Sequence, residues 1–251
     1  MPALKYLRSS LVFFDPPFGY GLEVWDSPDK IWDLKYWLLV LQSLRAILAD
    51  GATLAAFGDC FNVLPPLMQA IQAFNAKSSQ KGSPLFVSPV QFCFQKTNHP
   101  HKGTAGYSQS VENVFLFFYG APPKIKKMAF ELGGNLLSAA RVAGDRVIKG
   151  PDGTQLNPCQ KNPLLLRALI ENHATPNTIV LDLTAGSFSS YLACYLSTLP
   201  LHWAGCDIAE NALSMWDHIQ DSLLTSVEVD ADPNKTWFSK FVCGTNFIYL
   251  F

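Results

Sequence analysis

The chain has 251 residues, of which 49% are hydrophobic and 16% are charged, so it can bury the core of one large domain and is not a disordered chain. The sequence contains no uncharged apolar run of about 18 residues and no apolar signal-peptide segment, so we expect a soluble, intracellular protein without membrane contact. Its six cysteines are scattered without a C-x-x-C pair, which argues against a metal site and against a disulfide framework.

The first half of the sequence predicts strands and helices in alternation. Residues 11–14 form a short apolar run that fits a buried strand, and the prolines after it end the strand. Apolar residues at helical spacing predict a helix over 29–49 that stops at Asp50 and Gly51, followed by a strand over 52–58. The remaining elements expected in this half are a helix over 62–74 and strands over 85–96 and 111–120.

The second half returns to this alternation after a linking region. Residues 121–157 contain several Gly-rich and Pro-rich stretches, so we expect loops, short elements or a short recognition region there. The elements expected next are a helix over 162–174, a strand over 178–182, a helix over 188–199, a strand over 201–208 and a helix over 209–224. Such alternation predicts a Rossmann-like, doubly wound α/β sheet in a single domain, with 1–120 and 158–251 as its two halves.

Basic charge is concentrated in the middle of the chain. Between Gln91 and Lys161 there are nine Lys or Arg residues against four Asp or Glu residues, although the whole chain has a net charge of −1. Many of these residues lie in segments rich in Gly, Pro and Asn, which indicates loops that could follow a phosphate backbone. A solvated surface is the alternative for any one of them. The candidates for nucleic-acid contact are Lys96, Lys102, Lys124, Lys126 and Lys127.

Two acid-containing turns are candidate functional sites. The stretch DPPFG, which starts at Asp15, is either an ordinary turn or a rigid ligand-binding turn at the carboxyl end of a strand. The turn LTAGS, around Gly186, would let a ligand approach the backbone closely. Asp207 ends the next expected strand, where an acid can accept hydrogen bonds from a ribose. Because G-x-G-x-x-G is absent, these turns favour a nucleoside cofactor without a pyrophosphate over the dinucleotide of an oxidoreductase.

Three motifs in order carry a resemblance to a known family. The stretch DPPFGYG resembles the D-P-P-[YFW] motif of S-adenosylmethionine-dependent amino-methyltransferases that act on nucleic-acid bases. NPCQKNPLLLRALI resembles the family's H-P-x-Q-K-P-x-x-L-x-x-x-L-I segment, and VLDLTAGSFSS resembles its V-L-D-P-F-A-G-S-G-T-T cofactor loop. With the catalytic motif first and the cofactor loop last, the chain resembles the circularly permuted β-group of DNA adenine-N6 and cytosine-N4 methyltransferases.

The resemblance implies methyl transfer to an exocyclic amine, with adenine N6 in DNA as the favoured target. The Asp15 carboxylate and the Pro16 carbonyl would accept the two N–H groups of the amine, Pro17 would help to fix the turn, and Phe18 would stack on the extruded base. The implied S-adenosylmethionine-binding residues are Lys161, Asp182, Ala185, Gly186, Ser187 and Asp207. The short region 121–157 suggests that target recognition is degenerate or depends on a partner subunit or a second copy of the chain.

Several positions depart from the family pattern. Phe188 replaces the second glycine of G-S-G, Asn162 replaces the proline of Q-K-P, Asn157 replaces the histidine, and Leu183 and Thr184 replace Pro-Phe. A phenylalanine at the glycine position would either narrow the cofactor pocket or point into the core. These changes leave a second hypothesis open, in which the chain is a non-catalytic subunit that binds nucleic acid or an active partner.

Overall fold

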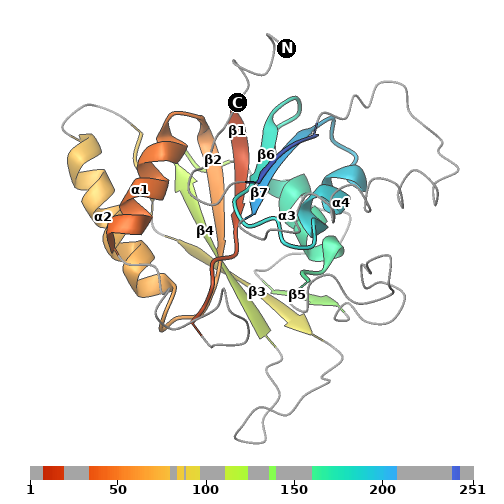
Figure 1. Ribbon diagram of the computed structural model, residues 1–251, viewed down its shortest axis with the longest axis horizontal. Coiled ribbons are helices and arrows are strands. Elements are labelled where there is room, and N and C mark those ends of the chain that lie inside the picture. Colours follow the sequence, from red (N-terminus) through yellow and green to blue (C-terminus); the bar gives the residue numbers. More distant parts are fainter. Residues whose placement is uncertain are drawn as a thin grey trace, which may run out of the picture.

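The computed structural model describes residues 8–19, 34–79, 84–87, 89–96, 111–123, 136–139, 160–207 and 239–243, which form a sheet with helices on both faces (Figure 1). The strands are β1 (Ser9–Phe14), β2 (Leu48–Phe57), β3 (Val90–Lys96), β4 (Val111–Tyr119), β5 (Leu136–Ala139), β6 (Ile179–Asp182), β7 (His202–Asp207) and β8 (Ser239–Cys243). The helices are α1 (Leu34–Arg45), α2 (Leu64–Ser79), α3 (Pro163–His173) and α4 (Ser189–Tyr195). None of these helices is both long and apolar enough to span a bilayer.

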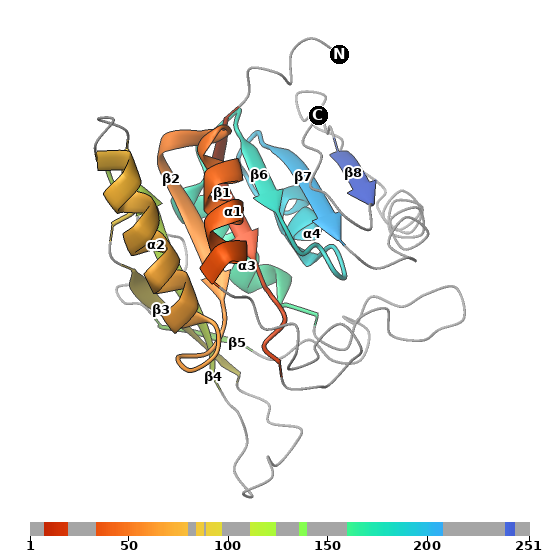
Figure 2. The same ribbon diagram turned by 60° about the vertical axis from the view of Figure 1, so that its left-hand side comes forward.

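The first described strand, β1, lies in the middle of the sheet. The strand order is β5-β3-β4-β2-β1-β6-β7-β8, and β1 pairs in parallel with both β2 and β6. From β1 the chain builds one flank of the sheet, and it then returns to build the other flank with β6, β7 and β8, which lie in that order toward the opposite edge (Figure 2). The direction of winding therefore reverses between β1 and β6, and such a reversal opens a crevice at the carboxyl ends of parallel strands.

The apolar run of β1 is buried on both faces of the sheet. Leu11 and Phe13 join the core formed with α3 and α4, whereas Val12 and Phe14 join the core formed with α1 and α2. On the second face, the Phe14 ring meets the Trp37 ring edge to face at a centroid distance of 5.0 Å. A parallel strand covered on both sides needs a continuous apolar sequence, which explains why this strand lacks polar alternation.

Most of the expected elements are present in the part of the chain that the structure describes, and the prediction of a doubly wound α/β sheet is confirmed. The predicted end of the first helix is wrong. Helix α1 ends at Arg45, and Asp50 and Gly51 lie inside β2, where the pairing with β1 shifts register and Gly51 has a φ of 79°. Asp50-Gly51 therefore belongs to an irregular strand start.

Other boundaries differ for identifiable reasons. Strand β3 starts at Val90, directly after Pro89, which has no N–H to donate to a ladder. Strand β5 falls within the expected linking region, and β8 adds an edge strand where the sequence showed no clear pattern. The helix expected over 209–224 lies outside the described residues.

Candidate active site

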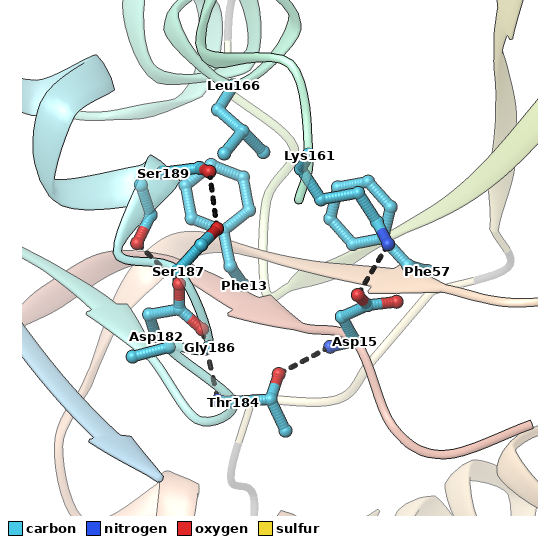
Figure 3. A pocket seen from close by; sticks show the side chains of 12 residues that line it. Phe13, Asp15, Phe57, Lys161, Leu166, Asp182, Thr184, Gly186, Ser187 and Ser189 are labelled. Atoms are coloured by element: carbon cyan, nitrogen blue, oxygen red, sulfur yellow. Dashed lines mark hydrogen bonds and ion pairs between the residues drawn. The ribbon is translucent and has the colours of Figure 1, made fainter. Parts of the chain in front are cut away.

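A pocket lies where the carboxyl ends of β1, β2 and β6 meet (Figure 3). It holds about 360 Å³ of empty space, a volume that includes the part that opens to solvent. The residues that line it are Phe13, Asp15, Phe57, Lys161, Leu166, Asp182, Thr184, Ala185, Gly186, Ser187, Ser189 and Ser190. The pocket thus occupies the crevice that the sheet topology predicts.

Asp15 is fixed from two sides as it leaves β1. Its backbone N–H donates to Thr184 Oγ1 at 2.8 Å, which ties the turn after β1 to the turn after β6. Its carboxylate Oδ2 accepts from Lys161 Nζ at 2.5 Å, and the two side chains point toward each other beside Phe57 (Figure 3). The side chain of Asp15 is 26% exposed and that of Lys161 is 15% exposed, so the carboxylate is preorganised and still accessible.

Phe57 forms the wall behind this ion pair. It is the last residue of β2, and its ring centroid lies 5.3 Å from Lys161 Nζ, within the range of a cation–π contact. Phe57 also packs on Phe13 at a centroid distance of 6.4 Å. The ring covers the ammonium group and helps to hold it toward Asp15.

Asp182 supplies a buried carboxylate at the end of β6. It accepts hydrogen bonds from the Thr184 N–H at 3.0 Å and from the Ser190 hydroxyl, which in turn accepts from Trp203 Nε1 at 3.0 Å. The pKa of Asp182 is raised to about 7, chiefly by burial and in smaller part by the nearby carboxylates of Asp15 and Asp207, while the hydrogen bonds from Ser190 and Thr184 lower it. A cation placed beside Asp182 would favour its ionised form.

The turn after β6 brings backbone groups to the pocket. Gly186 has a φ of 50°, which glycine adopts without the penalty that a Cβ would bring, and its N–H donates to Asp207 Oδ2 at 2.6 Å. The Ala185 N–H donates to the Cys206 carbonyl at 2.9 Å, which ties the same turn to β7. These two hydrogen bonds attach the turn to the end of β7, and Ala185 and Gly186 line the pocket.

Phe188 points into the core and is not among the residues that line the pocket. The side chain is fully buried, and its ring meets the Trp203 ring edge to face at a centroid distance of 6.1 Å. Its backbone has a φ of 57° and a ψ of 26°, a left-handed conformation that is costly for an aromatic residue. Of the two outcomes expected for this position, the structure thus shows the second, and the backbone explains why a glycine would also fit here.

Asn162 has a structural role at the start of α3. Its side chain accepts a hydrogen bond from the Leu164 N–H at 2.8 Å, and its carbonyl accepts from the Leu166 N–H at 3.2 Å. Asparagine is among the preferred N-cap residues, and its φ of −72° is one that a proline would also adopt. At this position the rigid proline of the family pattern is therefore replaced by an asparagine that caps the helix.

The turn after Asp15 is anchored by the loop that follows β2. Pro16 is buried, whereas Pro17 and Phe18 are partly buried, and Phe18 packs against both cores. The Phe18 carbonyl accepts a hydrogen bond from Asn62 Nδ2 at 3.1 Å. Gly19 ends the described part of the turn with a φ of 76°.

The structure places most of the predicted site residues together. Asp15 shares the pocket with five of the expected cofactor-binding residues, which are Lys161, Asp182, Ala185, Gly186 and Ser187. Asp207 is not among the residues that line the pocket, but it accepts a hydrogen bond from Gly186, which does line it. Pro16, Pro17 and Phe18 follow Asp15 in the chain and are not among the residues that line the pocket.

Of the five lysines predicted to contact nucleic acid, only Lys96 lies within the described residues. Lys96 ends β3, whose carboxyl end lies at the same edge of the sheet as Asp15, because β3 and β2 both run antiparallel to β4. Lys102, Lys124, Lys126 and Lys127 fall outside the described residues.

Six residues that line the pocket were not among the site residues predicted from the sequence: Phe13, Phe57, Leu166, Thr184, Ser189 and Ser190. Phe57 ends an apolar strand and is indistinguishable in sequence from core residues. Thr184 stands next to predicted residues in LTAGS, so its place in a turn at a strand end was the available signal.

Solved structures resemble this fold, whereas no protein-family model and no curated protein matches the sequence. M1.HpyAVI, in a complex with SAM, superimposes with a TM-score of 0.60 at 17% identity, covering 84% of this chain and 88% of that chain. The PvuII DNA methyltransferase, which is cytosine-N4-specific, gives a TM-score of 0.60 at 13% identity, covering 92% and 85%. The chain therefore has the Rossmann-like fold of these proteins over most of its length.

Proposed function

We propose that this chain is an S-adenosylmethionine-dependent methyltransferase of the permuted β-group that methylates the exocyclic amino group of a nucleic-acid base, with adenine N6 in DNA as the target. The observation that carries the proposal is that Asp15 of DPPF and the turn after β6 line one pocket. They are 169 residues apart in sequence and are joined by the hydrogen bond from the Asp15 N–H to Thr184. The proposed acceptor of the amine and the proposed cofactor loop are thus adjacent.

The charges of the pocket suit S-adenosylmethionine. Asp15 and Asp182 line it and Asp207 lies at its side, while Lys161 is the basic residue among those that line it. The cofactor carries a sulfonium and an ammonium group, so the carboxylates complement its cations, and Lys161 suits its carboxylate or keeps Asp15 ionised. When bound, the cofactor supplies an electrophilic methyl group. The cofactor could approach the backbone of Ala185, Gly186 and Ser187 closely, because these residues form the turn after β6.

Asp15 and Pro16 would prepare the amine for attack. The lone pair of an aromatic amine is delocalised into its ring, so the amine must be drawn toward tetrahedral geometry before it can attack. A carboxylate and a carbonyl held in one rigid turn can accept its two N–H groups. Phe18 would offer a ring face to the base, which must leave the duplex to reach the pocket.

The alternative of a non-catalytic subunit has less support in the structure. It rests on the departures from the family pattern, and the two that raised most doubt, Phe188 and Asn162, have roles in core packing and helix capping. Thr184, another departure, contributes the hydroxyl that receives the Asp15 N–H. The cytosine-N4 specificity of the PvuII enzyme keeps cytosine as the competing target base.

The proposal is tested by transfer of a labelled methyl group from S-adenosylmethionine to unmodified DNA, with RNA as a second substrate. Digestion of the product to nucleosides identifies the methylated base, and we expect N6-methyl-2′-deoxyadenosine from DNA. Calorimetry with the cofactor alone gives an independent measure of binding. Binding and transfer that are both absent, in protein shown to be folded by its unfolding transition, would leave the non-catalytic subunit as the better hypothesis.

Cofactor affinity should depend on pH through Asp182. Its pKa is raised to about 7, so its carboxyl is largely protonated in acid and ionised above neutrality. A cationic ligand binds the ionised form better, so affinity should fall as pH decreases below about 7, by at most tenfold per pH unit. Asp182→Asn should flatten this dependence and abolish the linked proton release seen by calorimetry in buffers of different ionisation enthalpy.

Glu171→Gln is the matched control for this experiment. Glu171 is a partly buried carboxylate of α3, paired with Arg167 at 2.7 Å, and it is not among the residues that line the pocket. The control should keep the pH dependence of the wild type. If Asp182→Asn kept it as well, another group would be responsible for the titration.

A further inference from the structure

The loop between β2 and α2, residues 58–63, leaves the sheet beside the DPPF turn. Strands β1 and β2 are parallel neighbours in which Phe14 lies opposite Ala56, so their following loops emerge at the same edge. Asn62 in this loop donates to the Phe18 carbonyl, which joins the two loops directly. A group projecting from this loop is therefore held next to the turn that is proposed to carry the target base.

The loop is rigidly constructed. Asp59 Oδ1 accepts hydrogen bonds from the Phe61 N–H at 2.7 Å and the Asn62 N–H at 2.5 Å, and the Asp59 carbonyl accepts from the Leu64 N–H at 3.1 Å. An added Cβ on Gly58 would lie 2.5 Å from the Val63 Cβ, so the loop closes on itself where only glycine fits. The side chains it presents thus start from a fixed backbone.

Phe61 projects from this loop into solvent. It is 86% exposed, more than any other large apolar side chain of the described residues, the next being Leu39 of α1 at 59%. A single exposed apolar residue is common on protein surfaces, so exposure alone has little meaning. What distinguishes Phe61 is a rigid backbone, a direct link to the DPPF turn and a loop whose only acid, Asp59, is engaged with backbone amides.

We propose that Phe61 stacks on a base of DNA next to the extruded target base. This inference rests on the proposed function. Extrusion removes the stacking partner of the neighbouring bases, and an apolar side chain inserted between base steps compensates for part of that loss. An aromatic ring also stacks on any base, which suits a loop that would act independently of sequence. Phe18 would hold the base that leaves the stack, and Phe61 would fill the position that it leaves.

The experiment compares Phe61→Ala and Phe61→Trp with Leu39→Ala. The last variant removes another exposed apolar side chain, in the middle of α1. The probe is a fluorescent DNA duplex of mixed sequence, measured by anisotropy, together with its single strand. Phe61→Ala should weaken binding by about five- to 150-fold, the equivalent of one lost base–aromatic stack. Phe61→Trp should bind like the wild type, because the π face is retained, and Leu39→Ala should also bind like the wild type.

Cofactor calorimetry on the same variants separates this inference from the proposed function. Phe61→Ala should bind S-adenosylmethionine like the wild type, since Phe61 is not among the residues that line the pocket. Suppose that the wild type neither binds the cofactor nor transfers methyl groups, but Phe61→Ala still binds DNA more weakly than the wild type. This result would support the role of Phe61 in DNA binding and contradict the proposed function. DNA binding equal to that of Leu39→Ala, or a wild type that binds no DNA, would overturn the role of Phe61. Unchanged DNA binding with an altered oligomeric mass would instead assign this loop to a protein partner.

Discussion

Replacing Asp15 with alanine should slow methyl transfer by about two to three orders of magnitude, the scale seen when one preorganised transition-state hydrogen bond is lost. The carboxylate is needed chiefly while the amine becomes tetrahedral, so the rate of transfer should fall much more than the affinity for S-adenosylmethionine. Single-turnover transfer of a labelled methyl group measures the first quantity, and calorimetry measures the second. Asp15→Ala with the wild-type rate would remove Asp15 from the chemistry.

Lys161 provides the control for this variant. It pairs with Asp15 at 2.5 Å, so alanine at position 15 also leaves a partly buried ammonium group without that partner. The double variant Asp15→Ala, Lys161→Met removes the unpaired charge and keeps an uncharged side chain of similar length at position 161. We expect it to remain slow, because the acceptor is still missing. Recovery of the rate in the double variant would mean that the unpaired lysine, rather than a lost acceptor, caused the defect.

Replacing Phe188 with alanine should lower the free energy of unfolding by about 3–5 kcal/mol, the range for a fully buried phenylalanine. The ring packs on Trp203, and its loss leaves a cavity behind the turn that follows β6. Phe188→Gly should be less destabilising than Phe188→Ala, by about 1 kcal/mol, because glycine adopts a φ of 57° without the penalty that a Cβ imposes. Urea unfolding followed by fluorescence measures both values.

Phe94 is the matched control for this order. It is as deeply buried as Phe188 but lies within β3, and it is not among the positive-φ residues. Glycine in a strand interior lowers the free energy of unfolding by about 0.5–1 kcal/mol relative to alanine. Phe94→Gly should therefore be more destabilising than Phe94→Ala, the reverse of the order at position 188. If alanine were the more stable replacement at both positions, backbone strain at Phe188 would make no measurable contribution.

The sheet was predictable because its elements have strong local signals. The apolar runs of β1, β2, β4 and β6 and the helical spacing of α1 and α3 each fall within one short window of sequence. The pairing of β1 with β6 joins segments that are far apart in the chain, so no local pattern shows it. Boundaries were less predictable, since the irregular start of β2 depends on its pairing with β1, and that pairing is not visible in a local pattern.

The candidate site was predictable only as far as its motifs extend. Asp15 and Gly186 could be selected because turn chemistry at strand ends marks them. The hydrogen bond from Asp15 to Thr184 and the contact of Phe57 with Lys161 are set by tertiary packing between distant segments, so no local pattern predicts them. The direction of the Phe188 side chain was likewise undecided in sequence, because it depends on the space beside Trp203.

The position of β1 between β2 and β6 has a consequence for synthesis of the protein. Strand β2 leaves the ribosome soon after β1 and pairs with one edge of it, whereas β6, which pairs with the other edge, is made only after β5 and α3. During that interval β1 is an apolar edge strand with unpaired backbone groups, the kind of surface that promotes association between nascent chains. The arrangement that assembles the pocket from two distant segments thus also makes translation the period of greatest exposure to aggregation.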